Sequence, residues 1–183
     1  MRYSTQFLNW RQDLCRRYCL GARSDEMIES FMQLDYPSYS YRTDKSVVDF
    51  DDAGPRTVMD AHCGLCAKGA RWIARNDMEM EFRIIPLQSD LGRALMRHYE
   101  MDPDDPLSWL YLQDGRAYSS LDAVMRVGKR FGGIWRLTAI LSILPRRLQD
   151  ALYGLVARNR YKFFGRTDLC AMPDPDVQKR LLQ

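Results

Sequence analysis

The residues best suited to chemistry in this chain are two cysteines separated by two residues, Cys63 and Cys66. They follow a short apolar run that ends in Asp60, and a helix-forming segment comes after them. The first N–H groups of a helix lack partners within it and carry roughly half a positive charge, which stabilises a thiolate. Such positions bring the pKa of a cysteine from about 8.5 to between about 3.5 and 7.5. The pattern therefore favours thiol–disulfide chemistry.

The two cysteines are expected to have different roles. Cys63 begins the predicted helix, so we expect it to be the exposed nucleophile with the lower pKa. Cys66 lies one turn further on the same side, close enough to form a disulfide, and would resolve the mixed disulfide. Two other interpretations remain open, namely a metal-binding pair and two buried cysteines without chemistry.

Two further residues of the same turn are candidates for the site. Asp60 ends an otherwise apolar strand. A partly buried carboxylate there could exchange the proton that Cys66 must gain or lose, or it could form the turn and cap the helix. His62 would stabilise a thiolate if protonated, but we expect an exposed turn histidine.

Length, charge and cysteine content restrict the class of protein. A chain of 183 residues can bury a core without disulfides. A net charge of +3 is too small to indicate nucleic-acid binding by itself. No segment has the pattern of a signal peptide or of a membrane span. With five cysteines and no export signal, we expect a cytoplasmic protein without structural disulfides.

The elements around the cysteines predict an α/β fold. Hydrophobic periodicity and turn residues indicate strands at 57–62, 80–87, 107–112 and 117–119 and helices at 63–76, 90–99 and 121–131. This order, β-α-β-α-β-β-α, predicts a mixed four-stranded sheet flanked by helices.

Three segments are expected along the chain. Residues 1–50 form an N-terminal helical extension that includes a possible edge strand at 46–50. Residues 51–131 form the core. Residues 132–183 form a C-terminal helical tail packed on the core, with helices at 134–144 and 146–164 and an irregular end.

Other features have simpler explanations. Cys15 and Cys19 suit a metal pair by spacing, but no second pair accompanies them, so we expect ordinary thiols. Cys170 is either a passive thiol or a third redox cysteine. The tail is basic and contains aromatic residues, which would suit nucleic acid or an acidic membrane, although a solvated helix face is the favoured interpretation.

The motif D-x-x-C-x-x-C at Asp60, Cys63 and Cys66 resembles the signature of the DCC family of thiol-disulfide oxidoreductases. Further matches are Pro86-Leu87-Gln88-Ser89, Ser120-Leu121-Asp122-Ala123, Gly133-Ile134-Trp135, Leu144-Pro145-Arg146, Asp150-Ala151-Leu152-Tyr153, Ala157-Arg158-Asn159-Arg160-Tyr161 and Cys170 with Pro173. The resemblance runs from about residue 57 to residue 173 and does not include residues 1–50.

The resemblance implies a thioredoxin-like fold, with Cys63 and Cys66 as the redox pair and Asp60 as the acid of the motif. The family usually has glycine where this chain has Ala61; if that position needs a positive φ, alanine would strain the turn. In thioredoxin-like proteins a cis-proline precedes the third strand and faces the dithiol. Pro106 occupies a similar place, although Asp105-Pro106 is equally typical of an ordinary loop.

Together these observations predict a thiol-disulfide oxidoreductase of the protein-disulfide reductase type that needs no cofactor. Its partners would be a disulfide-containing protein or a small-molecule thiol, with an external thiol as reductant. We expect neither nucleic acid nor membrane as a partner. The alternatives are a metal-binding module, with Cys63, Cys66 and either His62 or Cys170 as ligands, and a non-catalytic interaction domain.

Overall fold

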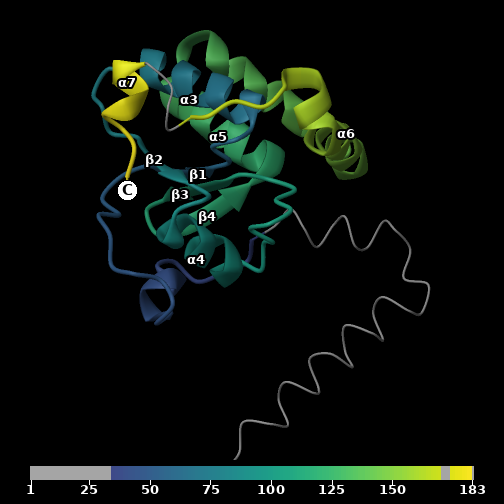
Figure 1. Ribbon diagram of the computed structural model, residues 1–183. Coiled ribbons are helices and arrows are strands. Elements are labelled where there is room, and N and C mark those ends of the chain that lie inside the picture. The colour runs from purple at the N-terminus through teal and green to yellow at the C-terminus, as the bar shows by residue number, and fades with distance from the viewer. Residues whose placement is uncertain (1–33, 170–173, 183) are drawn as a thin grey trace, which may run out of the picture. The chain divides into compact units, whose positions relative to one another are not determined.

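The computed structural model of the protein describes residues 34–169 and 174–182 (Figure 1). Its strands are β1 (Arg56–Met59), β2 (Arg83–Pro86), β3 (Leu110–Gln113) and β4 (Arg116–Ser119). Its α-helices are α3 (Gly64–Asn76), α4 (Asp90–His98), α5 (Ser120–Phe131), α6 (Arg146–Phe164) and α7 (Pro175–Gln178). Two 3₁₀-helices, η1 (Ser40–Thr43) and η2 (Gly133–Ile143), complete the described elements.

The four strands form one mixed sheet in the order β2-β1-β3-β4. Strand β1 is parallel to β2 and antiparallel to β3, and β3 forms an antiparallel hairpin with β4. This arrangement confirms the predicted α/β fold with a four-stranded mixed sheet, and it is consistent with a thioredoxin-like fold.

Alternate residues of the strands supply two separate cores, because successive side chains of a strand point to opposite faces. Met59 and Ile84 belong to a cluster with Ile73 of α3 and Val127 of α5. Val58 and Ile85 belong to a second cluster with α4 and with Tyr41 of η1. Helices α3 and α5 therefore cover one face of the sheet, and α4 covers the other (Figure 1).

The predicted elements differ from the structure mainly at their ends. Strand β2 begins three residues later than expected because Asp77 binds the backbone N–H groups of Glu81 and Phe82 and holds them in a turn. Residues 46–50 form no strand, so that prediction is wrong. The segment expected to be an α-helix at 134–144 is instead the 3₁₀-helix η2. The helices predicted before residue 34 lie outside the described residues, as do Cys15, Cys19 and Cys170.

The C-terminal end is more regular than the sequence indicated. Asp174 caps α7 by accepting hydrogen bonds from the backbone N–H groups of Asp176 and Val177. Beyond the helix the chain joins the sheet edge, where the N–H of Ile84 donates to the carbonyl of Arg180 over 2.7 Å. The guanidinium of Arg180 binds Asp77 in a buried ion pair, with 3.1 Å between Nε and Oδ2. This pair fixes the chain end against the turn before β2.

No helix among the described residues is both long enough and apolar enough to span a membrane.

Candidate active site

The motif forms a tight turn between β1 and α3. The N–H of Cys63 donates to the carbonyl of Asp60 over 3.2 Å, and the N–H of His62 donates to Oδ1 of Asp60 over 2.9 Å. Cys63 is the N-cap residue of α3, with extended backbone angles. Ala61 does not have a positive φ, so the alanine at this position causes no strain of that kind. The turn thus delivers both cysteines to the first turn of α3.

Asp60 is buried and held by four groups. Its carboxylate accepts hydrogen bonds from the hydroxyl of Tyr161 and from Nε2 of Gln88, the latter over 2.9 Å, in addition to the N–H of His62. The guanidinium of Arg160 lies 3.7 Å from Oδ2. Burial raises the pKa of Asp60, but the hydrogen bonds and the charge of Arg160 outweigh it and hold that pKa below its ordinary value. Asp60 is therefore a carboxylate at neutral pH.

These contacts test the expectation that Asp60 forms the turn and caps the helix. No side chain caps the N-terminus of α3, so Asp60 is not the helix cap. Its carboxylate forms the turn through His62 and joins the turn to the last part of α6 through Tyr161 and Arg160. Asp60 lies at the junction of elements that are distant in sequence.

The electrostatics of the two cysteines differ strongly. The pKa of Cys63 is lowered to about 6, first by the hydrogen bond from the thiol of Cys66, then by backbone N–H groups of Cys66 and Leu65 and by the charge of Arg160, against the opposing effect of burial. The pKa of Cys66 is raised by that same hydrogen bond, by burial and by the negative charge of Cys63. The arrangement stabilises a thiolate at Cys63 that accepts a hydrogen bond from the Cys66 thiol.

The expectation that Cys63 is exposed is wrong. Its exposed fraction is 0%, whereas Cys66 is half-buried. The chain that follows α6 crosses α3 (Figure 1) and pairs with the motif: Cys63 and Arg166 form an antiparallel β-bridge. The N–H of Thr167 donates to the carbonyl of His62 over 3.2 Å. We call residues 165–169 the covering segment, because they shield Cys63 from solvent.

Gly64 allows the covering segment to approach this closely. The N–H of Gly64 donates to the carbonyl of Gly165 over 3.1 Å. A Cβ placed on Gly64 would lie 2.1 Å from the carbonyl oxygen of Phe164, which is far inside van der Waals contact. A glycine directly after Cys63 is therefore required for this packing.

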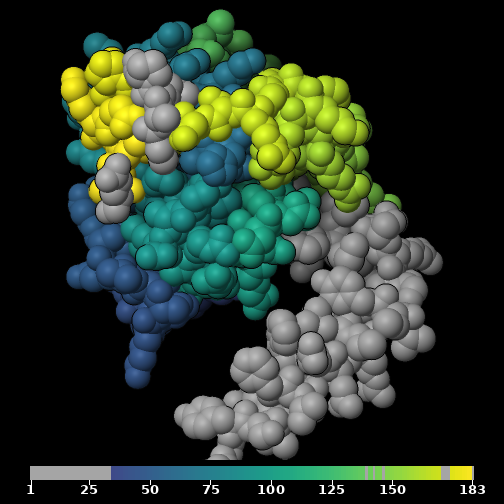
Figure 2. Space-filling view, viewed as in Figure 1, coloured from purple at the N-terminus to yellow at the C-terminus, as the bar shows by residue number. Residues whose placement is uncertain are grey.

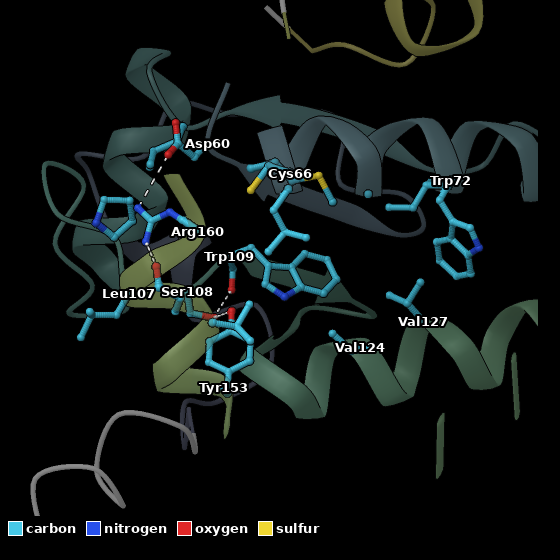
Figure 3. A pocket seen from close by; sticks show the side chains of 18 of the residues that line it. Asp60, Cys66, Trp72, Leu107, Ser108, Trp109, Val124, Val127, Tyr153 and Arg160 are labelled. Atoms are coloured by element: carbon cyan, nitrogen blue, oxygen red, sulfur yellow. Dashed lines mark hydrogen bonds and ion pairs between the residues drawn. The ribbon is translucent and has the colours of Figure 1, made fainter. Parts of the chain in front are cut away.

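Cys66 borders a cavity of about 360 Å³ (Figure 3). The cavity is enclosed by α3, α5, α6, η2 and the loop before β3. Its lining includes the apolar side chains of Leu65, Trp72, Ile73, Leu107, Trp109, Val124, Val127, Trp135 and Val156. Polar groups enter it from Ser108, Tyr153, Asp60 and Arg160. The space beside Cys66 is thus suited to an apolar group.

Ser108 connects the walls of this cavity. Its hydroxyl accepts a hydrogen bond from the N–H of Ser120 over 2.7 Å and lies 2.9 Å from the hydroxyl of Tyr153 on α6. Pro106, two residues earlier, also lines the cavity. All described peptide bonds are trans, that of Pro106 included. The loop before β3 therefore faces the dithiol, as the resemblance implied, but with a trans proline.

Several residues of the site were not assigned from the sequence. Gln88, Arg160 and Tyr161 lie in motifs that carry the family resemblance, and that signal could have identified them. Ser108 and Gly64 had no such signal. His62 is exposed, as expected. Within residues 34–169 and 174–182 no group of three potential ligands could hold a metal ion.

Comparisons with known proteins agree with the geometry. The chain is 30% identical over 125 residues to Uncharacterized protein YuxK of Bacillus subtilis, covering 68% of this chain and 91% of that one. It is 32% identical over 123 residues to a chloroplastic DCC family protein of Arabidopsis thaliana, covering 67% of this chain and 72% of that one. No solved structure matches. Residues 57–166, which contain the dithiol turn and the helix that contacts it, match the family model described as DCC1-like thiol-disulfide oxidoreductase, and the chain belongs to that family.

Proposed function

We propose that this protein is a thiol-disulfide oxidoreductase of the protein-disulfide reductase type, with Cys63 and Cys66 as its redox couple. One observation carries the proposal. Cys63 and Cys66 lie together at the start of α3, and the hydrogen bond from the Cys66 thiol lowers the pKa of Cys63 to about 6. A thiolate that can attack a substrate disulfide and an adjacent thiol that can resolve the mixed disulfide are the two groups that thiol–disulfide exchange requires.

The reaction follows from this arrangement. The Cys63 thiolate attacks one sulfur of a substrate disulfide, the substrate S–S bond breaks, and the leaving thiolate takes a proton. Cys66 then attacks the Cys63 sulfur of the mixed disulfide, and its proton passes to the second substrate sulfur, which leaves as a thiol. The substrate gains two electrons, and an external thiol reduces the Cys63–Cys66 disulfide that remains. No cofactor takes part, and the cytoplasm would supply the reductant.

Two groups of residues support these steps. The guanidinium of Arg160 favours the thiolate form of Cys63, and Asp60 positions Arg160 through their ion pair. The cavity beside Cys66 would hold an apolar side chain next to the scissile disulfide. Because the covering segment shields Cys63, it must lift before a substrate sulfur can reach that atom.

Trapping of mixed disulfides tests the proposal. Cys66→Ser should accumulate a covalent complex with a disulfide substrate at Cys63, whereas Cys63→Ser should form none. Each variant should lose reduction of insulin disulfides. If Cys63→Ser traps substrate and Cys66→Ser does not, Cys66 is the nucleophile and Cys63 the resolving cysteine. If both variants still reduce disulfides as fast as the parent chain, the proposed activity is wrong.

A further inference from the structure

The outer surface of η2 and α6 is more apolar than a solvated surface usually is. Along η2, Ile134, Leu137, Ile140 and Ile143 are 55% to 78% exposed. They are spaced by three residues, and side chains with this spacing eclipse one another in a 3₁₀-helix. These four residues therefore form one apolar row along the outside of η2.

Helix α6 presents a second apolar row. Leu148, Leu152, Leu155, Val156 and Phe163 are 39% to 65% exposed, and their spacing puts them on one side of the helix. The buried side of α6 carries Gln149, Asp150, Ala157 and Arg160 instead. An amphipathic helix normally directs its apolar side to the core. In α6, the contacts of Arg160 and Tyr161 with Asp60 hold the polar side inward, so the apolar side faces outward. Figure 2 shows α6, in yellow-green, on the outside of the described part.

The cavity connects the two rows. Trp135 of η2 and Val156 of α6 are 38% and 39% exposed, and both line the cavity beside Cys66. The cavity mouth therefore opens onto the surface that carries the rows. We call this surface, made of the two rows and Trp135, the apolar platform.

The exposed charged residues of η2 and α6 are basic. Between residues 133 and 165 the chain has six basic residues, of which Arg160 is buried beside Asp60, and one acidic residue, Asp150, which is also buried. On α6, Arg147, Arg158 and Lys162 are exposed and follow one side of the apolar row. None of these three pairs with a carboxylate anywhere in the described ranges.

The charge distinguishes among possible occupants of the platform. A second copy would bring one basic surface against another. The undescribed residues 1–33 have nearly equal numbers of basic and acidic residues, five and four, so they offer little complementary charge. An anionic lipid surface offers both an apolar layer for the rows and negative charge for the basic residues.

We propose that the apolar platform of η2 and α6 rests on an anionic lipid bilayer, with its apolar rows in the interfacial layer and its basic residues against the lipid phosphates. This binding does not depend on the proposed redox reaction. It would direct the cavity mouth toward the lipid, so that an apolar group could reach Cys66 from the bilayer.

Sedimentation of the full-length chain with vesicles tests the platform. The chain should bind phosphatidylcholine vesicles that contain phosphatidylglycerol, bind pure phosphatidylcholine vesicles much more weakly, and dissociate as ionic strength rises. The triple variant Leu137→Ser, Ile140→Ser, Leu155→Ser should reduce binding about tenfold or more. Reversal of charge at Arg147 and Arg158 to Glu should have a similar effect.

Matched controls come from exposed residues elsewhere. Val48→Ser with Met78→Ser removes apolar side chains that are even more exposed, and Lys45→Glu with Arg75→Glu reverses exposed charges, all outside the platform. These variants should bind vesicles as the parent chain does. The proposal is overturned if the parent chain binds no vesicles, or if the controls lose binding equally. It is also overturned if the triple variant instead dissociates a dimer. The same holds if the triple variant lowers the free energy of unfolding, because covering of the platform by residues 1–33 would require that result.

Discussion

Tyr161 donates its hydroxyl hydrogen bond to the buried carboxylate of Asp60, a residue 101 positions earlier in the chain. This contact joins the last turns of α6 to the end of β1. It fixes the side of α6 that faces the dithiol and, through the chain that follows α6, the segment that shields Cys63.

Replacement of Tyr161 tests the strength of this contact. Tyr161→Phe keeps the ring but removes the donor, and a hydrogen bond to a buried charged group contributes about 1.5–3 kcal/mol. We expect the free energy of unfolding in urea to fall by that amount at about pH 7. Tyr118→Phe is the control, because the half-buried Tyr118 has no hydroxyl hydrogen bond among the described contacts. This variant should change the free energy of unfolding little.

The pH dependence of the same variant follows from Asp60. Because the pKa of Asp60 is lower in the folded chain than its ordinary value of 3.8, the folded chain binds fewer protons than the unfolded chain between those two values. The stabilisation is therefore complete above the ordinary value and is lost as pH falls through the folded value. The difference between Tyr161→Phe and the parent chain should narrow in urea titrations below about pH 4. A difference that grows toward acid would contradict this.

The charge of Arg160 should have a measurable effect on the pKa of Cys63. The rate of iodoacetamide alkylation at Cys63 should rise with pH around a midpoint near 6. Arg160→Gln removes a charge that lowers this pKa, so its midpoint should move upward. Arg158→Gln, which removes an exposed charge two residues away, is the control and should leave the midpoint in place. Mass spectrometry of the labelled peptide reports each site.

Gly64 should control access to Cys63. In Gly64→Ala the new Cβ meets the carbonyl oxygen of Phe164, so the covering segment must move away. We expect alkylation of Cys63 at fixed pH to accelerate by about tenfold or more as the buried sulfur becomes exposed. Gly69→Ala in the same helix places its Cβ no closer than 4.0 Å to Met59 and should leave the rate unchanged. Equal rates in both variants would mean that the covering segment does not limit access.

The chain end should contribute strongly to stability. Arg180→Ala leaves the carboxylate of Asp77 buried without its ion pair, which costs about 3–5 kcal/mol. Lys179→Ala removes an adjacent exposed charge and should cost no more than about 1 kcal/mol. Urea unfolding of both variants measures the difference. A small effect at Arg180 would show that the end of the chain is not held by this pair.

The sequence alone predicted the dithiol turn, the order of strands and helices and the family. These features are local. A helix start is indicated by the residues that form it, and the short apolar runs of β1 and β2 indicate strands before any contact is known. The late start of β2 was missed because Asp77 acts through hydrogen bonds that periodicity does not reveal.

The tertiary structure determined which sides of those elements are buried and which are exposed. The spacing of Leu148, Leu152 and Leu155 places them on one side of α6, but it does not show whether that side is buried or exposed. The ion pair of Arg160 with Asp60 directs that side outward. Likewise, a helix start predicts a low pKa for Cys63, whereas its complete burial depends on the covering segment, about 100 residues later. The sequence by itself determined which atoms can react; only long-range packing determined which of them a substrate can reach, because burial depends on contacts between distant parts of the chain.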